Sequence, residues 1–187
     1  SACCGGSDAI GHAAALVADG ESDLAICGGT EAPLYYHPML ELKMAGLSPD
    51  TADRPTQLSR PFDMWRTTGV IGEGACILIL EPESSPRPGY AFVSGYSFAT
   101  DPAAEPGLGL LEAIRLCLAN AGVRPWDIDV INAWGPGHKI LDAVEAPSPE
   151  LLDAVSDFSN RRVLQPLHET VAHAVPGVPG PRHYRLP

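Results

Sequence analysis

The sequence is short of positive charge. Its 12 lysines and arginines are outnumbered by 23 aspartates and glutamates, which gives a formal net charge of −11 at pH 7. No basic cluster offsets this balance, and an acidic surface repels phosphate backbones and anionic membranes. The chain also shows no signal peptide and no apolar run of about 18 residues, the length that can cross a bilayer. We therefore expect a cytoplasmic protein that binds neither nucleic acid nor membranes.

Paired cysteine motifs are missing as well. The five cysteines form an odd number, and neither a C-x-x-C motif nor a paired-histidine pattern accompanies them. Disulfide frameworks and zinc sites depend on such pairs. Neither is predicted for Cys3, Cys4, Cys27, Cys76 and Cys117.

The chain has enough apolar residues to build a core. Of its 187 residues 45% are hydrophobic, which suits one medium domain or two small ones. Apolar spacing alternates between helical and strand-like periods, and this alternation indicates a layered α/β fold. Helices are predicted from Ser7 or Asp8 to Gly20 and at 38–46, 107–122, 139–146 and 148–158; strands are predicted at 23–29, 74–82, 90–99, 128–135 and 161–166.

Two further expectations concern the sheet and the ends of the chain. A turn at 84–89 separates strands 74–82 and 90–99, so the two are expected to be neighbours in a sheet. Residues 176–187 are rich in proline and glycine without a strand or helix period, and we interpret them as a frayed or truncated tail. Because chemistry-bearing residues begin at once, we expect a fragment or a processed half of a longer protein.

Four blocks in order resemble the β-ketoacyl-ACP synthases, the thiolase-like condensing enzymes of fatty-acid and polyketide assembly. They are ACCGG-SDAIGHA, AICGGTEAP, LSRPFDMWRTTGVIGEGACILILE and DIDVINAWGPGHKILDAVEA, and they cover roughly residues 1–146. The resemblance implies a thiolase-like layered α/β/α/β/α fold that is incomplete here, with the upstream part of the first half missing. It divides the chain into 1–89, the later part of the N-terminal half; 90–175, the C-terminal half; and the tail 176–187.

Cys3 inherits the family's nucleophile position, in its A-C-x-x-G block. A thiol at a strand-to-helix corner has its thiolate favoured by the helix dipole and by free backbone N–H groups. Such a thiol can accept an acyl group from a thioester, and the same amides can form part of an oxyanion hole. The alternative is that Cys3 is a small buried residue. Cys4 is interpreted as packing.

The family's two histidines are not retained in their expected form. Where the family has N-A-H-G-T, this sequence has Trp134, and an indole donates one hydrogen bond but cannot cycle a proton. His138, four residues on, is interpreted as a surface side chain. For the second histidine two registers remain open: one puts Gln165 and Thr170 at the family's lysine and histidine, and the other puts His168 and His173 there. His173 is the tentative catalytic candidate, with a structural role as its alternative.

Other matched residues are interpreted as framework. The R-P-F-D motif at 60–63 is expected to organise the pocket floor, with a solvated turn as the alternative. Glu73 and Glu145 are expected to be structural acids, and Gly28, Gly29 and Gly135 to allow close backbone approach or positive φ. The aromatic residues Tyr35, Tyr36 and Trp65 are candidates for an acyl tunnel or for packing.

Three functions stay open. The first is a working condensing enzyme. The second keeps the thiol without the usual condensation, as an acyltransferase or as a specialised synthase with a different decarboxylation strategy. The third is a non-catalytic partner such as a chain-length subunit. The resemblance implies an acyl carrier protein as partner, which carries substrates on its phosphopantetheine arm, and a homodimer or a heterodimer with another ketosynthase. It implies no metal and no bound organic cofactor. Candidates for a carrier-docking patch, otherwise a scattered solvated face, are Arg60, Arg66, Arg161 and Arg162.

Overall fold

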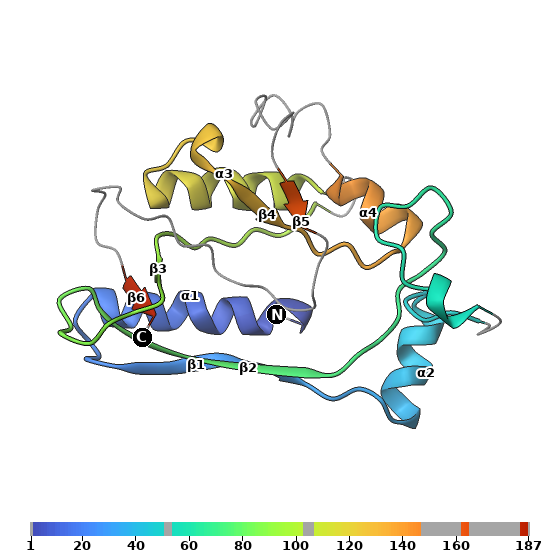
Figure 1. Cartoon of the computed structure of the whole chain (residues 1–187), viewed down its shortest axis with the longest axis horizontal. Coiled ribbons are helices and arrows are strands. Elements are labelled where there is room, and N and C mark those ends of the chain that lie inside the picture. The colour runs from blue at the N-terminus through green and yellow to red at the C-terminus, as the bar shows by residue number, and fades with distance from the viewer. Residues whose placement is uncertain (1, 51–53, 103–106, 147–161, 165–183, 187) are drawn as a thin grey trace. The chain divides into compact units, whose positions relative to one another are not determined.

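The computed structural model describes residues 2–50, 54–102, 107–146, 162–164 and 184–186. The chain forms two compact units: residues 1–30, 75–130 and 170–187 make the first, and residues 31–74 and 131–169 make the second. Helices and strands alternate along the chain (Figure 1), as the α/β prediction requires.

The first unit opens with the helix predicted near the N-terminus. Helix α1 spans Gly5–Ala18 and follows a 3-10 turn at Ala2–Cys4. Its N-cap is Cys4, so the helix starts earlier than a cap at Ser7 or Asp8 would allow. Gly20 follows its end with φ of 71°, a left-handed conformation that suits glycine after a helix.

Four strands form the sheet of the first unit, in the order β1-β2-β6-β3. β6 runs antiparallel to both neighbours, with Arg185 opposite Glu81 of β2 and opposite Phe92 of β3. The prediction that 74–82 and 90–99 are neighbours is therefore wrong, and so is the prediction of a tail without strand structure. A three-residue strand is too short to show a period, and only its pairing reveals it. The bounds are β1 Ala25–Glu31, β2 Gly74–Pro82, β3 Ala91–Val93 and β6 Tyr184–Leu186.

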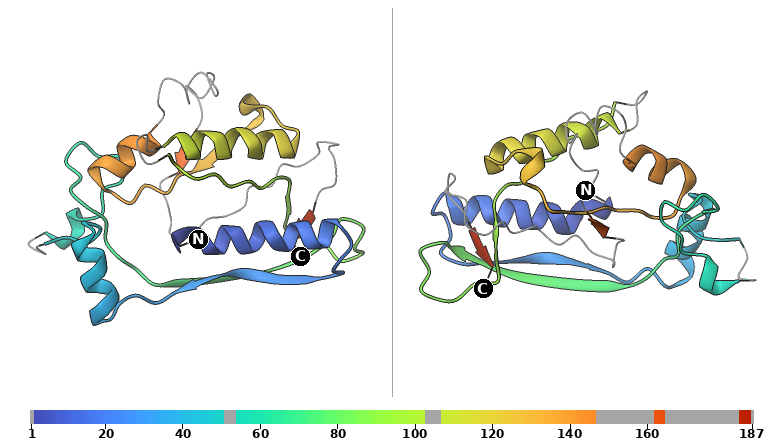
Figure 2. Two further views of the ribbon diagram at one scale, coloured as in Figure 1. Left: turned by 180° about the vertical axis from the view of Figure 1, so that it is seen from behind. Right: turned by 45° about the horizontal axis from the view of Figure 1, so that its top comes forward.

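The core of the first unit lies between α1 and this sheet. α1 runs along β1 and β2 in every view (Figures 1 and 2). Leu80 of β2 is fully buried, and burying a leucine side chain contributes roughly 2 kcal/mol. The buried members are Ile10, Ala13, Ala14, Val17, Cys27, Leu80 and Val93.

Helix α3, Leu108–Ala121, explains why β3 is shorter than predicted. It matches the predicted helix 107–122, with Gly122 at its end in a left-handed conformation. The Asn120 side chain donates a hydrogen bond to the Tyr96 carbonyl at 3.0 Å, and the Ser97 hydroxyl donates to the Ala113 carbonyl at 2.5 Å. Tyr96 and Ser97 are thus hydrogen-bonded to side-chain and backbone groups of α3 rather than to a neighbouring strand. A 3-10 turn at Pro125–Asp127 follows.

The second unit holds shorter elements. Helix α2 spans Tyr36–Met44, and α4 spans Lys139–Glu145 as predicted. β4, Val130–Asn132, pairs with β5, Arg162–Leu164, inside the predicted strand 161–166. A 3-10 turn lies at Pro55–Gln57. The predicted helix 148–158 lies outside the described residues.

Among the helices of the described residues, none combines the length and the apolar character that a membrane span needs. All five cysteines are free thiols.

Candidate active-site residues

The predicted nucleophile lies just before α1. Cys3 belongs to the 3-10 turn Ala2–Cys4, and its side chain is exposed. Cys4, the N-cap, makes no side-chain hydrogen bond to the first turn. The first N–H groups of the helix therefore have no cap from that residue. This combination of an exposed thiol and uncapped amides suits attack on a thioester and stabilisation of an oxyanion.

Cys4 does not pack as predicted. Its side chain is exposed. The buried residues of α1 begin only at Ile10, six residues after Cys4. Two exposed thiols therefore stand next to each other at this corner.

Glycines bring α1 and β1 close together near Cys3. A Cβ on Gly6 would lie 3.6 Å from the Cα of Gly29. Gly28 has φ of 144°, and a Cβ there would lie 2.0 Å from the carbonyl oxygen of Cys76 on β2. The predicted need for close backbone approach at this pair is confirmed.

A tyrosine that the sequence did not single out contacts the same helix. The Tyr96 hydroxyl donates a hydrogen bond to Asp8 Oδ1 at 2.5 Å, and the ring lies against Gly11. Burial raises the pKa of Tyr96 to about 12, and the hydrogen bond to Asp8 and the charges of Asp8 and Cys4 add to this effect. A tyrosine 88 residues away gives no local signal of this contact.

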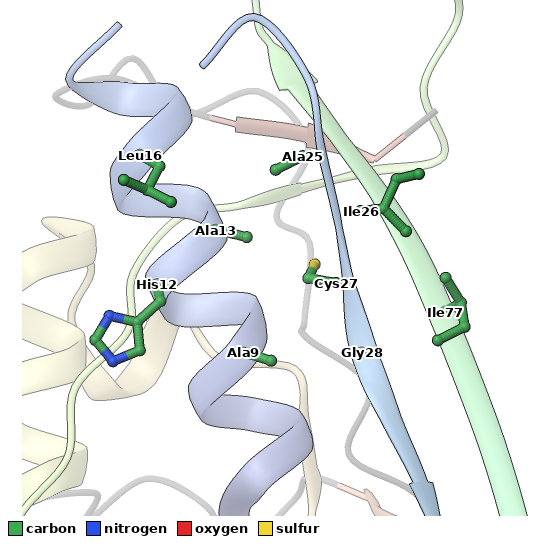
Figure 3. A pocket seen from close by; sticks show the side chains of 9 residues that line it. All are labelled: Ala9, His12, Ala13, Leu16, Ala25, Ile26, Cys27, Gly28 and Ile77. Carbon is green, nitrogen blue, oxygen red and sulfur yellow. The ribbon is translucent and has the colours of Figure 1, made fainter. Parts of the chain in front are cut away.

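An open groove of about 470 Å³ runs along the other end of α1 and does not include Cys3. Figure 3 shows Ala9 and Ala13 facing Cys27 of β1 across it. Burial raises the pKa of the Cys27 thiol, with a smaller contribution from Cys76. The groove is lined by Ala9, His12, Ala13, Leu16, Ala25, Ile26, Cys27, Gly28 and Ile77.

In the second unit, Trp134 stands where the family has its first histidine. Its side chain is 53% exposed. The backbone N–H groups of Trp134 and Gly135 donate to the two oxygens of Glu145, at 2.5 and 2.6 Å. Glu145 therefore has the structural role that was predicted. Gly135 has φ of 48°, and a Cβ there would lie 2.9 Å from the Phe62 ring, which confirms its predicted backbone role.

Asp142 organises the surroundings of this segment, and the sequence analysis missed it. Its carboxylate is fully buried and accepts hydrogen bonds from the N–H groups of Phe62 at 2.8 Å and Gly137 at 2.9 Å. Arg66 Nε lies 3.1 Å from Asp142 Oδ2 without the alignment of a hydrogen bond, so that contact is mainly one of charge. The only local signal was an acid three residues before Glu145, on a similar side of the helix.

The R-P-F-D motif at 60–63 is framework rather than a solvated turn. The backbone N–H of Phe62 donates a hydrogen bond to the Asp142 carboxylate, and Phe62 has φ of 60°, a strained value for a phenylalanine. Asp63 accepts a hydrogen bond from the N–H of Trp65 at 2.7 Å. The fold of this loop is thus fixed by α4.

Of the residues predicted for the surface, His138 is partly exposed and also caps a helix, whereas the prediction for Arg66 needs correction. His138 is the N-cap of α4, and its Nδ1 accepts from the N–H groups of Ile140 and Leu141 at 3.3 and 3.4 Å. Arg66 pairs with Asp142 and donates to the Lys139 carbonyl at 2.9 Å, so it is not a free docking charge. Arg60 Nη1 lies 3.9 Å from Asp63 Oδ1. Arg161 lies outside the described residues, as does the side chain of Arg162.

The remaining candidates divide into framework and exposed residues. Glu73 accepts a hydrogen bond from the Leu34 N–H at 3.1 Å, which is a structural role as predicted. Tyr35, Tyr36 and Trp65 are exposed and do not belong to the core of the second unit. The segment that carries Gln165, His168, Thr170 and His173 lies outside the described residues, so the role of His173 stays a prediction.

Two family descriptions match the chain in sequence. Residues 1–85 match the "Beta-ketoacyl synthase, N-terminal domain", and residues 89–161 match the "Beta-ketoacyl synthase, C-terminal domain". The chain belongs to the β-ketoacyl synthase family. The resemblance that the four motif blocks indicated is thereby confirmed.

Curated relatives of this ketosynthase chain are longer than the chain itself. A 3-oxoacyl-[acyl-carrier-protein] synthase 2 of Rhizobium meliloti is 34% identical over 92% of this chain and 43% of the relative. A putative polyketide beta-ketoacyl synthase 1 of Streptomyces virginiae is 33% identical over 92% of this chain and 42% of the relative. The chain thus spans less than half the length of these relatives.

Solved ketosynthases share the fold. The ishigamide ketosynthase/chain length factor superposes with a TM-score of 0.72 at 33% identity, over 85% of this chain and 39% of the other. A chain from the structure of a type II polyketide-synthase acyl-carrier protein in complex with its ketosynthase superposes with a TM-score of 0.73 at 26% identity. The match covers 86% of this chain and 42% of the other. The predicted thiolase-like α/β class is confirmed, as part of that fold.

Proposed function

We propose that this chain carries the acyl-accepting thiol of a ketosynthase of fatty-acid or polyketide biosynthesis. The observation that carries the proposal is the exposed thiol of Cys3 directly before α1, where the N-cap residue leaves the first N–H groups without a side-chain cap. The Cys3 thiolate attacks the carbonyl carbon of an acyl thioester and forms a new C–S bond, and the bond from that carbon to the carrier's sulfur breaks, so that the carrier leaves as its thiolate and takes up a proton from water. The N–H groups at the start of α1 stabilise the negative oxygen.

Condensation is the second step. The malonyl unit loses carbon dioxide, and the electron pair of the broken C–C bond attacks the acyl carbonyl on Cys3. The C–S bond then breaks and the Cys3 thiolate returns. An imidazole normally assists the loss of carbon dioxide in this family, and Trp134 offers only an N–H donor on a half-exposed ring. Acyl transfer is therefore the better supported half of the reaction.

A second candidate is a partner subunit without condensing activity. Trp134 favours it, because the position is occupied by a residue that cannot exchange a proton. One similar solved structure is named as a ketosynthase/chain length factor. The free thiol of Cys3 favours the first candidate, since a partner of this kind has no need of a nucleophile.

The proposed partners are an acyl carrier protein, which delivers the substrate on its phosphopantetheine arm, and a second ketosynthase subunit, identical or not. One similar structure is a ketosynthase in complex with its acyl-carrier protein. The proposed location is the cytoplasm, and the proposed reaction uses neither a metal nor a resident organic cofactor. Because Arg66 is held by Asp142, the carrier is expected to dock elsewhere.

Intact-protein mass spectrometry tests this function on the complete reading frame that contains the sequence. The protein is incubated with an acyl carrier thioester and then with a malonyl carrier thioester, and Cys3→Ala is the control. An acyl adduct that the variant lacks, followed by a ketoacyl product, supports a condensing enzyme. An adduct that goes no further supports the acyltransferase, and the absence of any adduct supports the partner subunit.

A further inference from the structure

Two thiols follow one another at the corner where α1 begins. Cys3 and Cys4 are consecutive residues of the 3-10 turn Ala2–Cys4, and both are exposed, free thiols. The peptide bond between them is trans, which puts their Cα atoms about 3.8 Å apart. The acyl transfer proposed above uses Cys3 alone and gives the second thiol no part.

The backbone at this pair has room to rearrange as far as Gly5. Cys4, the N-cap of α1, makes no side-chain hydrogen bond to the first turn. A Cβ added to Gly5 would meet no atom of the described residues within 4 Å, and a glycine accepts backbone angles that other residues disfavour. Gly6 is packed on β1, since a Cβ there would lie 3.6 Å from the Cα of Gly29. A change of the turn can therefore end at Gly5 and leave the rest of α1 in place.

An exposed thiol with a second thiol next to it is the arrangement of redox-sensing cysteines. The first thiol is oxidised to a sulfenic acid, and the neighbouring thiol condenses with it to a disulfide. Without such a neighbour, oxidation continues to the sulfinic and sulfonic acids, which thiols do not reduce. A nucleophilic thiol that accepts acyl groups is open to this oxidation, and Cys4 lies where it can stop the reaction at the reversible stage.

We propose that Cys3 and Cys4 form a peroxide-sensitive thiol pair, in which Cys4 converts oxidised Cys3 into a disulfide and thereby turns the acyl acceptor off reversibly. The loss of acyl acceptance rests on the proposed function of Cys3, whereas the oxidation does not depend on it. The site is thus a modification site, and the reagent that it takes is hydrogen peroxide.

The oxidation proceeds in two displacements. The Cys3 thiolate attacks hydrogen peroxide, an S–O bond forms, the O–O bond breaks and hydroxide leaves. The Cys4 thiolate then attacks the Cys3 sulfur, an S–S bond forms, and the S–O bond breaks with loss of a second hydroxide. Both hydroxides take up the protons that the thiols released. Two thiols are oxidised to one disulfide, and one peroxide is reduced to two molecules of water.

A disulfide between consecutive residues is strained, which makes it easy to reduce. Ordinary disulfides join Cα atoms about 4.4–6.8 Å apart, and consecutive residues lie below that range. Strained or exposed disulfides are the labile ones, and they serve regulation rather than stability. A dithiol reductant breaks the S–S bond, is itself oxidised to a disulfide, and returns Cys3 and Cys4 to thiols.

The test uses the complete reading frame, reduced beforehand, and compares wild type with Cys4→Ala. Alanine is chosen because serine at the N-cap would add the hydrogen bond that Cys4 lacks. Cys76→Ala, at another exposed thiol, is the matched control. After dilute peroxide, free thiols are alkylated and the protein is cleaved after glutamate, because a cut at Glu21 separates Cys3 and Cys4 from the other three cysteines of the sequence. Mass spectrometry reports the state of that peptide before and after dithiothreitol.

We expect the pair to become lighter by two hydrogen atoms in wild type and in Cys76→Ala, and to regain both alkylatable thiols with dithiothreitol. Cys4→Ala should give a sulfenic acid that dimedone captures, and then a sulfinic acid that dithiothreitol leaves unchanged. Irreversibly oxidised Cys3 should be at least about tenfold more abundant in Cys4→Ala, because an adjacent thiol reacts at high effective concentration.

Two outcomes would overturn the inference. One is equal irreversible oxidation of Cys3 in wild type and in Cys4→Ala. The other is a disulfide that joins Cys3 to a different cysteine or to a second copy of the chain. Should Cys4→Ala not fold, wild type alone decides: a reversible link between Cys3 and Cys4 supports the inference, and a sulfinic acid without that link contradicts it.

The thiol pair and the proposed function fail in different ways. An acyl carrier thioester is added to the untreated, the oxidised and the re-reduced protein. An acyl adduct that peroxide abolishes and dithiothreitol restores supports both. If the disulfide forms and reverses but no form is acylated, the pair stands and the acyl-accepting function fails. If Cys3 is acylated but peroxide converts it to sulfinic acid in wild type, the function stands and the pair fails.

Discussion

The carboxylate of Asp142 lies 3.1 Å from the guanidinium of Arg66, and this pair ties a loop of the second unit to helix α4. The Asp142 side chain is fully buried, and that of Arg66 is 17% exposed. Arg66 also donates to the Lys139 carbonyl of α4, 73 residues further along the chain. Such a buried pair matters for stability mainly because removing one partner leaves the other as an uncompensated buried charge.

Asp142→Asn is therefore expected to lower the free energy of unfolding by about 3 kcal/mol, because Arg66 keeps its charge and loses its counter-charge. Chemical denaturation of the complete reading frame measures this loss. The matched control is Asp50→Asn, whose exposed carboxylate lies 3.7 Å from Lys43 and should cost less than about 1 kcal/mol. Equal losses for the two variants would contradict the assigned role of Asp142.

Leu80→Ala tests the core between α1 and the sheet. Leu80 is fully buried, and its truncation leaves a cavity that costs about 2–5 kcal/mol. Ile79, its neighbour on β2, is 41% exposed, so Ile79→Ala should cost clearly less. Denaturant midpoints of the two variants check the order, and a larger loss for Ile79→Ala would mean that the packing side of β2 is assigned wrongly.

Gly28→Ala is expected to prevent the normal pairing of β1 and β2. The added Cβ would lie 2.0 Å from the Cys76 carbonyl oxygen, a backbone atom that cannot move without shifting the strand. Gly20→Ala is the control, since Gly20 also has positive φ but open space around the added atom. That variant should cost only about 1 kcal/mol. The two variants are compared by the yield of folded protein and its thermal unfolding midpoint. Similar values for Gly28→Ala and Gly20→Ala would contradict the close approach of β1 to β2 at Gly28.

Trp134→His tests whether condensation is limited by the missing imidazole. If the chain is part of a ketosynthase, the variant should raise the rate of ketoacyl product formation by about 10²-fold or more, the range expected for a general acid or base. Product is measured by mass spectrometry after incubation with acyl and malonyl carrier thioesters. Trp65→His, at an exposed tryptophan, controls for a gain unrelated to position. No gain with Trp134→His would favour the partner subunit.

The titration of Tyr96 gives a prediction about pH. Its pKa is raised to about 12 in the folded protein, so its contribution to stability is fully present below pH about 10 and is lost as the pH rises through about 12. Absorbance of the tyrosinate in the near ultraviolet should show a late-ionising tyrosine that Tyr96→Phe removes. Asp8→Asn should move this ionisation to lower pH. An unchanged profile in Asp8→Asn would mean that burial alone raises the pKa.

Local pattern was sufficient for the long elements. The strand predicted at 74–82 agrees with β2, and the helices predicted at 107–122 and 139–146 agree with α3 and α4 within about one residue at each end. These segments carry strong apolar periods or a glycine at the helix end. Short elements lacked such signals: β3 is three residues of a predicted ten, and β6 was not predicted.

The site residues show the same division. The order of the motif blocks identified the family and placed Cys3 before a helix, because the residues involved are adjacent in the sequence. It could not find Asp142 or Tyr96, whose partners lie 80 and 88 residues away. It also assigned Cys4 to packing and missed the capping role of His138, because burial and capping depend on which residue begins the helix.

The sequence by itself thus determined the acidic charge, the α/β class, the family and the position of the thiol, all properties of composition or of local order. Only the tertiary structure decided which charged groups are buried and paired, which glycines lie under a ring or a carbonyl, and that residues 184–186 form a strand between β2 and β3. The physical reason is that these depend on contacts between distant segments, whose geometry no local pattern encodes.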